Sequence, residues 1–274
     1  MSTPKVAVLG GGVMGATVAA AVVAAGWQAS EVTVAEPRPE RRAELAERHG
    51  LATVASAAEA VRGAGVVVVA VKPNQVATVL EEVSRELADD VVVVTVAAGL
   101  PAAFYEQRLP SGTPLVRVMP NTPAVIGKGA SAIAPGTHAS AEHLDLAERL
   151  LGATGLVVRV AEKDLDAVTA VSGSGPAYVF YVIDAMAEAG VLLGLTRELA
   201  TQLAVATVEG AAALVAETGE HPVVLRERVS SPGGTTVAAL AELDSRGVRA
   251  GILAAAERCR DRSVELGSEA TGGA

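Results

Sequence analysis

The segment from Lys5 to Gly15 constrains the fold of this chain more than any other part of its sequence. An apolar run at Lys5–Leu9 leads directly into Gly10-Gly11-Gly12-Val13-Met14-Gly15, and a helical pattern follows from Met14 to Ala25. Glycine at the first, third and sixth positions permits a tight turn, a close approach of the backbone to a ligand, and close packing of the helix on the strand. The segment therefore predicts a strand, a glycine-rich turn and a helix in immediate succession.

The first half of the chain continues this alternation of short apolar runs and helical patterns. Strands are expected at Lys5–Leu9, Glu31–Ala35, Val66–Val71, Val91–Val96, Leu115–Val118, Ser131–Ala134 and Val157–Val160. Helices are expected at Met14–Ala25, Pro39–His49, Ala57–Arg62, Gln75–Leu87 and Ala141–Leu151. Several strands are apolar on both faces, which is typical of a parallel sheet covered by helices on both sides. We therefore predict an α/β domain with a doubly wound parallel sheet of the Rossmann type.

The pattern changes after about Glu162, and no convincing strand follows. The helices expected there are Leu165–Val171, Gly175–Val191, Arg197–Thr218, Pro222–Val229, Thr235–Asp244 and Val248–Leu266. The sequence thus predicts two domains, at residues 1–161 and at residues 162–274, of which the second is entirely helical. We expect the last residues, Ser268–Ala274, to form a disordered tail.

The composition suggests how the apolar surface is buried. Half of the 274 residues are hydrophobic, 19% are charged, and the mean hydropathy is +0.40. No apolar run reaches the roughly 18 residues that a membrane span requires. With no room for a signal peptide ahead of Lys5, we expect a soluble, cytoplasmic protein. The apolar excess, much of it Ala and Val, predicts burial between subunits in a helical dimer interface.

Charge and cysteine content exclude further classes of function. The net charge of −9 argues against a nucleic-acid partner, because binding to phosphate backbones requires clustered Lys and Arg. The single cysteine, Cys259, permits neither an internal disulfide nor a thiolate metal cluster, and it reads as a small buried hydrophobe. Spacings of the H-x-x-x-H or C-x-x-C type are absent from the sequence, so no metal site is expected.

The glycine-rich turn is expected to hold the pyrophosphate of a dinucleotide. The N-terminus of the following helix offers N–H groups and a partial positive charge to the phosphates. We assign this role to the residues Gly10, Gly12, Val13, Met14 and Gly15. A glycine-rich turn without a ligand is the alternative, and the flanking strand and helix argue against it.

The end of the second strand bears on the choice between NADH and NADPH. An acidic residue there binds the ribose hydroxyls of NADH, whereas an arginine accommodates the 2′-phosphate of NADPH. This chain has Glu36 at the strand end, followed by Arg38, Arg41 and Arg42. Glu36 directed into the site would favour NADH, and Arg38 folded over it would favour NADPH. The sequence leaves both cofactors open.

Further cofactor contacts are expected where other strands end. Ligands of open α/β sheets bind at the carboxyl ends of the strands. Small residues that allow the backbone to approach the nicotinamide ribose follow two of these strands, and they are Ala70-Val71-Lys72-Pro73 and Ala97-Ala98-Gly99. Lys72 either contacts a phosphate or ribose or is a solvated surface lysine. We add Asn121, whose amide lies between Pro120 and Pro123, to the expected cofactor-binding residues.

Three segments of unusual composition point to a second ligand. Arg117–Pro123 follows a strand, while Ser172-Gly173-Ser174-Gly175-Pro176 and Ser230–Thr236 each open a helix. A helix that starts with Ser, Thr and Gly presents N–H groups to an anion such as a carboxylate. Simple helix capping is the alternative for each of them.

Taken together, these motifs resemble the pyrroline-5-carboxylate reductase family. The resemblance runs from Lys5 to about Leu266 and includes, in order, the glycine-rich turn, Val71-Lys72-Pro73, Arg117–Pro123, Ser172–Tyr178 and Ser231–Thr236. It implies a Rossmann domain, a helical dimerisation domain and a pocket shared by two interlocked chains, with five dimers often forming a decamer. The departure from the family pattern is Val13, where many members carry Asn or Gln. Only a side-chain contact is lost there.

The resemblance also implies residues for the substrate and for catalysis. The substrate carboxylate would rest on Ser231 and on backbone N–H groups near Gly234, Thr235 and Thr236, and Glu162 would also reach the substrate. Thr236 would lie near the ring nitrogen as the catalytic hydrogen-bonding group. The expected reaction is hydride transfer from NADPH or NADH to the C=N bond of 1-pyrroline-5-carboxylate, giving L-proline. A protonated imine requires no strong acid, and no histidine is expected to be catalytic.

Two alternatives use the same scaffold. A 3-hydroxyacid dehydrogenase would need a lysine general base in the helical domain, where the sequence offers only Lys163 at its very start. A non-catalytic dinucleotide sensor would have no use for the intact substrate motifs. Reduction of an imine is therefore the favoured function.

Overall fold

The computed structural model describes residues 3–270, which divide into two compact units. The sheet unit consists of the chain up to Ser174 together with the stretch that starts at Cys259, and the helical unit is Gly175–Arg258. The chain therefore leaves the sheet unit once and returns to it. The sequence pattern instead suggests a single boundary, after residue 161.

The sheet unit contains an eight-stranded sheet in the order β3-β2-β1-β4-β5-β6-β7-β8. Its strands are β1 (Val6–Leu9), β2 (Val32–Ala35), β3 (Ala52–Val54), β4 (Val66–Val69), β5 (Val92–Thr95), β6 (Leu115–Met119), β7 (Gly129–Pro135) and β8 (Gly155–Arg159). The chain moves outward from β1 to β3 and then crosses back to β4 on the other side of β1. This reversal creates a crevice at the carboxyl ends of β1 and β4, the place where doubly wound sheets bind ligands.

One strand pair corrects the expectation of an entirely parallel sheet. All neighbouring strands run parallel except β6 and β7, which pair antiparallel with Val118 opposite Ile133. The connection between them, Pro120–Lys128, contains only a 3-10 turn at Thr122–Ile126. A parallel crossover needs a dozen or more residues, usually with a helix, so this short connection returns the chain in the opposite direction.

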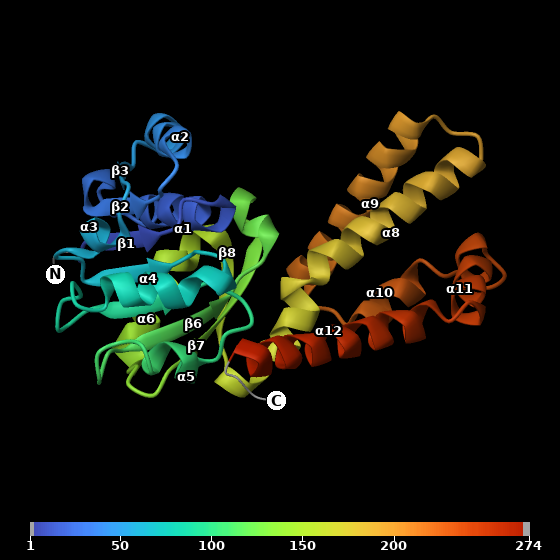
Figure 1. Ribbon diagram of the computed structural model, residues 1–274. Coiled ribbons are helices and arrows are strands. Elements are labelled where there is room, and N and C mark those ends of the chain that lie inside the picture. The colour runs from blue at the N-terminus through green and yellow to red at the C-terminus, as the bar shows by residue number, and fades with distance from the viewer. Residues whose placement is uncertain (1–2, 271–274) are drawn as a thin grey trace. The chain divides into compact units, whose positions relative to one another are not determined.

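Alternation along the buried strands fills a core on each face of the sheet. Val6 and Val8 of β1 point into one core, whereas Ala7 and Leu9 point into the other. The first face is covered by α1 (Val13–Ala24), α2 (Pro39–His49) and α6 (Ala141–Leu151). The second is covered by α3 (Ala57–Val61), α4 (Val76–Val83) and α5 (Ala102–Glu106), so helices flank the sheet on both sides (Figure 1).

Local signals set the ends of these helices. The helix α2 starts with Pro39 at its first position and stops at Gly50, which adopts a left-handed conformation with φ of 63°. Both residues suit these positions, because proline fixes φ and glycine tolerates a positive φ. Pro39–His49 has the bounds expected from the sequence, whereas the short elements β3 and α5 were not foreseen.

The last part of the sheet unit contains an uncommon helical turn. After α7 (Leu165–Val168), the chain forms a π-helix over Thr169–Gly173. The final turns of α12 (Val248–Ala270) also belong to this unit, where Ser263 Oγ donates a hydrogen bond of 2.6 Å to Asp166 Oδ1. The expected disordered tail is therefore wrong for Ser268–Ala270, which are helical, and residues 271–274 lie outside the described chain.

The helical unit contains α8 (Gly175–Leu192), α9 (Arg197–Thr218), α10 (Pro222–Arg228), α11 (Thr235–Ser245) and the first part of α12. The helices α8 and α9 form an antiparallel pair with close contacts, since a Cβ at Gly190 would lie 2.7 Å from Ala200 Cβ. Most large apolar side chains of the unit are exposed, among them Phe180 and Leu192. A single copy of this chain therefore leaves much of this apolar surface uncovered.

Candidate active site

The glycine-rich turn lies at the crevice between β1 and β4. Gly10 N donates a hydrogen bond of 2.9 Å to Ala35 O, and Ala70 N donates one of 2.9 Å to Leu9 O. Gly10 has a φ of 104°, and a Cβ there would stand 2.9 Å from Ala70 O. The turn is thus held against the ends of three neighbouring strands, β2, β1 and β4.

The other two glycines of the motif have different surroundings. A Cβ on Gly15 would lie 1.9 Å from Gly10 O, so the close packing of α1 on the turn requires glycine. A Cβ on Gly12 would meet no atom within 4 Å, so space is open beside this residue. Gly12 is also the N-cap of α1 and provides no side-chain cap, which leaves the first N–H groups of the helix to a ligand or to water. This open cradle at a helix N-terminus fits a dinucleotide pyrophosphate.

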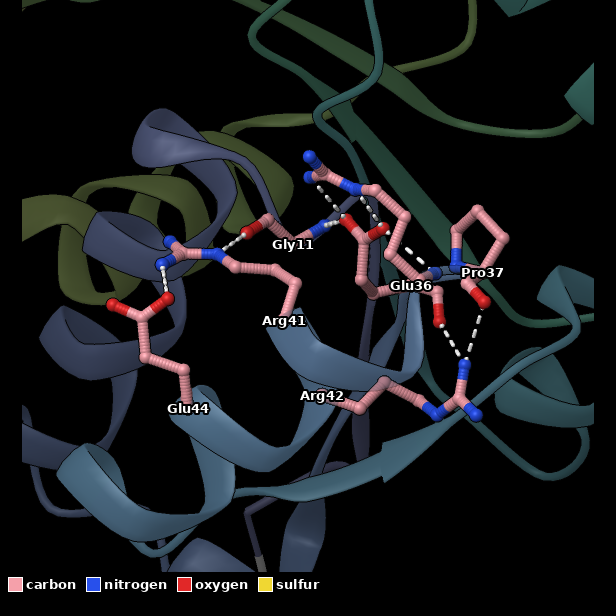
Figure 2. Close-up of polar contacts among 7 residues, drawn as sticks. Gly11, Glu36, Pro37, Arg41, Arg42 and Glu44 are labelled. Atoms are coloured by element: carbon pink, nitrogen blue, oxygen red, sulfur yellow. Dashed lines mark hydrogen bonds and ion pairs between the residues drawn. The ribbon is translucent and has the colours of Figure 1, made fainter.

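The carboxylate of Glu36 forms part of the support of this turn. Glu36 follows β2 and is 4% exposed, and its Oε2 accepts a hydrogen bond of 3.2 Å from Gly11 N (Figure 2). Arg38 contacts both carboxylate oxygens, with its Nε 2.8 Å from Oε1 and a terminal nitrogen 3.3 Å from Oε2. Burial on its own raises the pKa of Glu36, but the hydrogen bonds and charge of Arg38 outweigh it and hold the pKa below its ordinary value. Glu36 is therefore a buried, ionised carboxylate.

Two further arginines donate hydrogen bonds to backbone oxygens of the glycine-rich turn and of the loop after β2. Arg41 Nε donates a hydrogen bond of 2.7 Å to Gly11 O, and its guanidinium also pairs with Glu44 (Figure 2). One terminal nitrogen of Arg42 donates to both Glu36 O and Pro37 O, at 2.8 Å each. Arg41 thus connects α2 to the glycine-rich turn, and Arg42 connects α2 to the loop after β2.

A cavity of about 680 Å³ gathers seven of the fifteen cofactor residues expected from the sequence. The expected residues that line it are Gly10, Gly12, Glu36, Arg38, Ala70, Val71 and Lys72. Glu82 of α4 also lines it, and sequence reasoning missed this residue. Its Oε1 accepts hydrogen bonds from Ser56 Oγ at 3.0 Å and from Ala58 N at 3.1 Å, so it caps the start of α3 at the cavity wall. The one sequence signal for Glu82 is its position on the side of α4 that lines the cavity.

The remaining cofactor residues lie elsewhere in the sheet unit. Gly15 is buried beneath the turn, Met14 packs against the core, and the exposed Val13 lines a different pocket, between α1 and α2. Pro73 starts a 3-10 turn just after Lys72. Their contacts with a cofactor remain predictions.

The loop after β5, Ala97-Ala98-Gly99, is supported by the C-terminal helix. Gly99 has a φ of 78°, and a Cβ there would lie 3.5 Å from Leu266 Cβ. A Cβ on Gly267 would stand 3.3 Å from Gly99 O. The last turns of α12 therefore lie against a loop that the sequence assigns to the cofactor.

Asn121 joins two of the motifs that the sequence singled out. Its Oδ1 accepts a hydrogen bond of 2.8 Å from Ala130 N, and its Nδ2 donates one of 3.1 Å to Ser172 O. Nearby, a Cβ on Gly173 would stand 2.2 Å from Met119 Cε. The segment after β6 and the π-helix at Thr169–Gly173 are thus packed together, and such π-helical turns are frequent at functional sites.

Glu162 has partners that the sequence did not reveal. Its Oε1 accepts hydrogen bonds of 2.6 Å from an Arg117 terminal nitrogen and of 2.6 Å from Ala102 N. Arg117 lies on β6 with only 14% of its side chain exposed, and Ala102 starts α5. Glu162 therefore ties three elements of the sheet unit together through one of its oxygens. A further contact with the substrate remains a prediction.

The expected substrate loop is in the helical unit. Ser231–Gly234 forms a turn in which Gly234 N donates a hydrogen bond of 2.9 Å to Ser231 O, and Gly233 has a φ of 67°. Gly234 is the N-cap of α11 and provides no side-chain cap. Thr235 and Thr236 begin the helix, with Thr236 partly buried and Thr235 exposed. The first turn of α11 thus presents N–H and hydroxyl groups, as a carboxylate site requires.

Comparison with known proteins identifies the family. Residues 162–266 match the model described as pyrroline-5-carboxylate reductase dimerisation, and residues 5–99 match NADP oxidoreductase coenzyme F420-dependent. The pyrroline-5-carboxylate reductase of Corynebacterium melassecola is 45% identical over 265 residues, which cover 96% of this chain and 98% of that protein. The chain belongs to the pyrroline-5-carboxylate reductase family.

Other members of the family support this assignment across the whole chain. The pyrroline-5-carboxylate reductase of Mycobacterium tuberculosis is 41% identical over 285 residues, covering 96% of each chain. A solved pyrroline-5-carboxylate reductase from Coxiella burnetii superposes with a TM-score of 0.91 at 34% identity, covering 97% of this chain and 99% of that one. The Plasmodium falciparum pyrroline carboxylate reductase, solved with NADP bound, superposes with a TM-score of 0.87 at 28% identity, covering 98% and 100%.

As a pyrroline-5-carboxylate reductase, the chain is an NAD(P)H-dependent oxidoreductase that converts pyrroline-5-carboxylate to proline. Its dimerisation domain makes it a homodimer. Within residues 3–270, no group of three or more His, Cys, Asp or Glu side chains is placed to hold a metal ion.

Proposed function

We propose that this chain reduces the C=N bond of 1-pyrroline-5-carboxylate by seating NAD(P)H on the Gly10–Gly15 turn and the substrate carboxylate on the first turn of α11. The open cradle beside Gly12, at the β1/β4 crevice, is the observation that carries the cofactor half of this proposal. The uncapped start of α11 supports the substrate half. The product is L-proline, and the reaction is the last step of its biosynthesis.

The cofactor residues divide by their contribution. The turn and the first N–H groups of α1 would hold the pyrophosphate, while the lining of the 680 Å³ cavity would hold the nucleoside. The loop Ala97–Gly99 and Asn121 would lie toward the nicotinamide, because they follow β5 and β6, which lie on the opposite side of the β1/β4 crevice from β2. When bound, NAD(P)H supplies the hydride.

The substrate residues bind and orient the imine. The Ser231 hydroxyl and the N–H groups near Gly234, Thr235 and Thr236 would hold the carboxylate, and Glu162 would also contact the substrate. A protonated ring nitrogen has no lone pair, so the Thr236 hydroxyl would accept its hydrogen bond and then donate one to the amine that forms. Thr236 thereby orients the ring without being a general acid, and positioning supplies much of the rate enhancement.

We also propose that the dimers of this chain assemble further. Family resemblance supports a decamer of five dimers with a pocket shared between two chains.

A cytoplasmic location without nucleic-acid or membrane partners is consistent with the charge of −9. Within the described residues, α9 has the length and composition of a membrane span, but a helix covered by a dimer partner has the same composition. The dimerisation model begins at residue 162, which supports a domain boundary after residue 161.

Steady-state kinetics test the proposal. The purified chain is expected to oxidise NADPH or NADH when given pyrroline-5-carboxylate, and Thr236→Ala is expected to lower kcat by about ten- to hundred-fold, the worth of one well-placed hydrogen bond. Thr207→Ala is the matched control, because the Thr207 hydroxyl bonds only to Leu203 O within α9.

Two results would contradict this proposal. Lack of turnover with both cofactors would exclude the reaction. Equal kcat for Thr236→Ala and Thr207→Ala would leave the reaction intact but remove Thr236 from the catalytic site.

A further inference from the structure

The hydrogen bonds of Glu36 bear directly on which cofactor the cavity accepts. A carboxylate offers about four acceptor positions, two on each oxygen. Oε1 of Glu36 accepts from Arg38 N at 3.1 Å and from Arg38 Nε at 2.8 Å. Oε2 accepts from Gly11 N at 3.2 Å and from a terminal nitrogen of Arg38 at 3.3 Å. All four positions are filled by the protein.

A carboxylate filled in this way is a poor partner for the ribose of NADH. The acidic residue after the second strand normally accepts hydrogen bonds from the ribose hydroxyls. Here those hydroxyls would have to displace Arg38 from Glu36, and a charged hydrogen bond would be exchanged for a neutral one. The Gly11 N–H would keep Glu36 in place, because it fixes Oε2 to the turn itself. Glu36 therefore acts as an anchor for Arg38 and Gly11.

Arg38 differs from Glu36, because only some of the hydrogen-bond donors of its guanidinium are occupied by the protein. Its guanidinium has five N–H donors, of which two go to Glu36, leaving three. Its side chain is 66% exposed and lines the same 680 Å³ cavity as Gly12 and Lys72. A guanidinium pinned by a buried carboxylate is pre-oriented, so little side-chain freedom is lost when it binds a phosphate.

Charges of both signs surround Arg38, and Glu40 is a carboxylate besides Glu36 that acts on it. Arg42 bonds only to backbone oxygens, so its positive charge is not paired with a carboxylate there. Lys72 adds a positive charge at the cavity, while Glu82 is engaged by Ser56 and Ala58 N. Glu44 is shared between Arg41 and Arg48. Arg42 therefore adds positive charge next to Arg38, against the negative charge of Glu40.

We propose that Arg38 binds the 2′-phosphate of NADPH, that Glu36 is a positioning residue and not the ribose acceptor, and that the chain prefers NADPH to NADH. The inference rests on the proposed seat of NAD(P)H in this cavity, and it adds the residue that selects between the two cofactors. Sequence alone leaves this choice open because Glu36 and Arg38 argue for different cofactors.

Calorimetric binding of 2′,5′-ADP and of 5′-AMP tests the inference without any turnover. The two probes differ only in the 2′-phosphate, and the wild-type protein is expected to bind 2′,5′-ADP at least about tenfold more tightly. Arg38→Gln is expected to abolish this difference while leaving 5′-AMP affinity unchanged. In kinetics, the same variant is expected to raise KM for NADPH about tenfold or more and to leave KM for NADH unchanged or lower, since Glu36 is released.

Arg62→Gln is the matched control. Arg62 has the same 66% side-chain exposure, pairs with a single carboxylate, that of Glu86, and lies outside the cavity lining. This variant is expected to keep the wild-type preference for 2′,5′-ADP.

Three results would overturn the inference: equal wild-type affinity for both probes, preference for NADH, or equal losses for both probes in Arg38→Gln. Failure of the proposed function would be distinguishable, because a protein that selects 2′,5′-ADP but does not reduce pyrroline-5-carboxylate retains the Arg38 site. Conversely, an active enzyme with no preference would retain the function and exclude the role of Arg38.

Discussion

The sheet unit and the helical unit bury apolar side chains to very different extents. The sheet unit fills two cores with whole Val and Leu side chains, including Val66, Val68 and Leu80 at 1% exposure or less. In the helical unit, Gly175–Arg258, the described residues classed as buried are Ala187, Ala200 and Ala204. Most of its large apolar side chains are exposed, such as Leu192 at 88%.

This difference shows that the two units obtain their stability from different sources. The hydrophobic effect stabilises a fold in proportion to the apolar area removed from water. The sheet unit removes that area within one chain, whereas the helical unit has to remove it against a second chain. The match of residues 162–266 to a dimerisation family has this physical basis.

The largest expected effect comes from placing a charge on the uncovered face. Phe180 of α8 is 61% exposed in one chain, and Phe180→Asp would bury a carboxylate twice in a symmetric dimer. Each buried charge costs several kcal/mol, so the dimer dissociation constant is expected to rise by roughly a thousandfold or more. Light scattering at decreasing concentration measures it.

The control for this variant has the same change in the other unit. Leu156 of β8 is 63% exposed, and Leu156→Asp is expected to leave the dimer intact. If both variants remained dimeric, the exposed face of α8 would not be the interface, and the contrast between the two units would lose its main support.

Two glycines of the glycine-rich turn allow effects on stability to be distinguished from effects on dinucleotide affinity. Gly15→Ala places a Cβ 1.9 Å from Gly10 O, and such overpacking is expected to lower the free energy of unfolding by about 1–3 kcal/mol. Gly12→Ala meets no atom within 4 Å, so its stability should match wild type while its dinucleotide affinity falls by about tenfold or more.

Thermal unfolding and calorimetric titration distinguish the two effects. Wild-type dinucleotide affinity in Gly12→Ala would show that the pyrophosphate does not approach the turn. Wild-type stability in Gly15→Ala would show that α1 can shift without loss of packing.

The smallest effect at neutral pH concerns a buried tyrosine of the sheet unit. Burial raises the pKa of Tyr105 to about 12, against a lowering by its hydrogen bond with Thr95 and by the charge of Arg117. The raised pKa stabilises the fold below pH 10, and this contribution, about 3 kcal/mol at most, is lost as pH rises from 10 to 12. Tyr181 of the helical unit is 78% exposed.

Chemical denaturation at pH 8 and pH 11.5 measures this dependence. Tyr105→Phe is expected to lose about 1 kcal/mol at pH 8, because Thr95 loses a partner, and to show a smaller drop between the two pH values than wild type. Tyr181→Phe is the control and should keep the wild-type drop. An equal drop in all three proteins would mean that Tyr105 ionises as it does in the unfolded chain.

Helices with strong end signals were predictable from the sequence to the residue. Arg197–Thr218 has the expected bounds because the Thr196 side chain caps its start and Gly219 adopts a left-handed conformation at its end. Shorter elements lacked such signals: β3 has three residues, and α5 is capped by a carboxylate sixty positions away, that of Glu162. The antiparallel β7 depended on the length of a connection, which hydrophobic periodicity does not report.

The parts of the site that consist of one continuous segment were predictable from the sequence. Contacts between residues far apart in the sequence were not. The glycine-rich turn and the strand ends at Ala70–Lys72 could be placed because each follows a recognisable strand. The Glu162–Arg117 pair, which joins positions 45 residues apart, could not, because the identity of a charged residue does not reveal its partner. The sequence predicts both Glu36 and Arg38 at the cofactor site, but which of them has hydrogen-bonding groups left for a cofactor depends on side-chain geometry.

The return of the chain to the sheet unit at Cys259 has a consequence for biosynthesis. A ribosome releases the strands and the glycine-rich turn first, yet the helical turns that lie against Gly99 are made only after the whole helical unit. Domains usually fold in order of synthesis. Here the nucleotide-binding half is complete only after the helical unit has been made, so a chain terminated within Gly175–Arg258 would lack part of the half that was translated first.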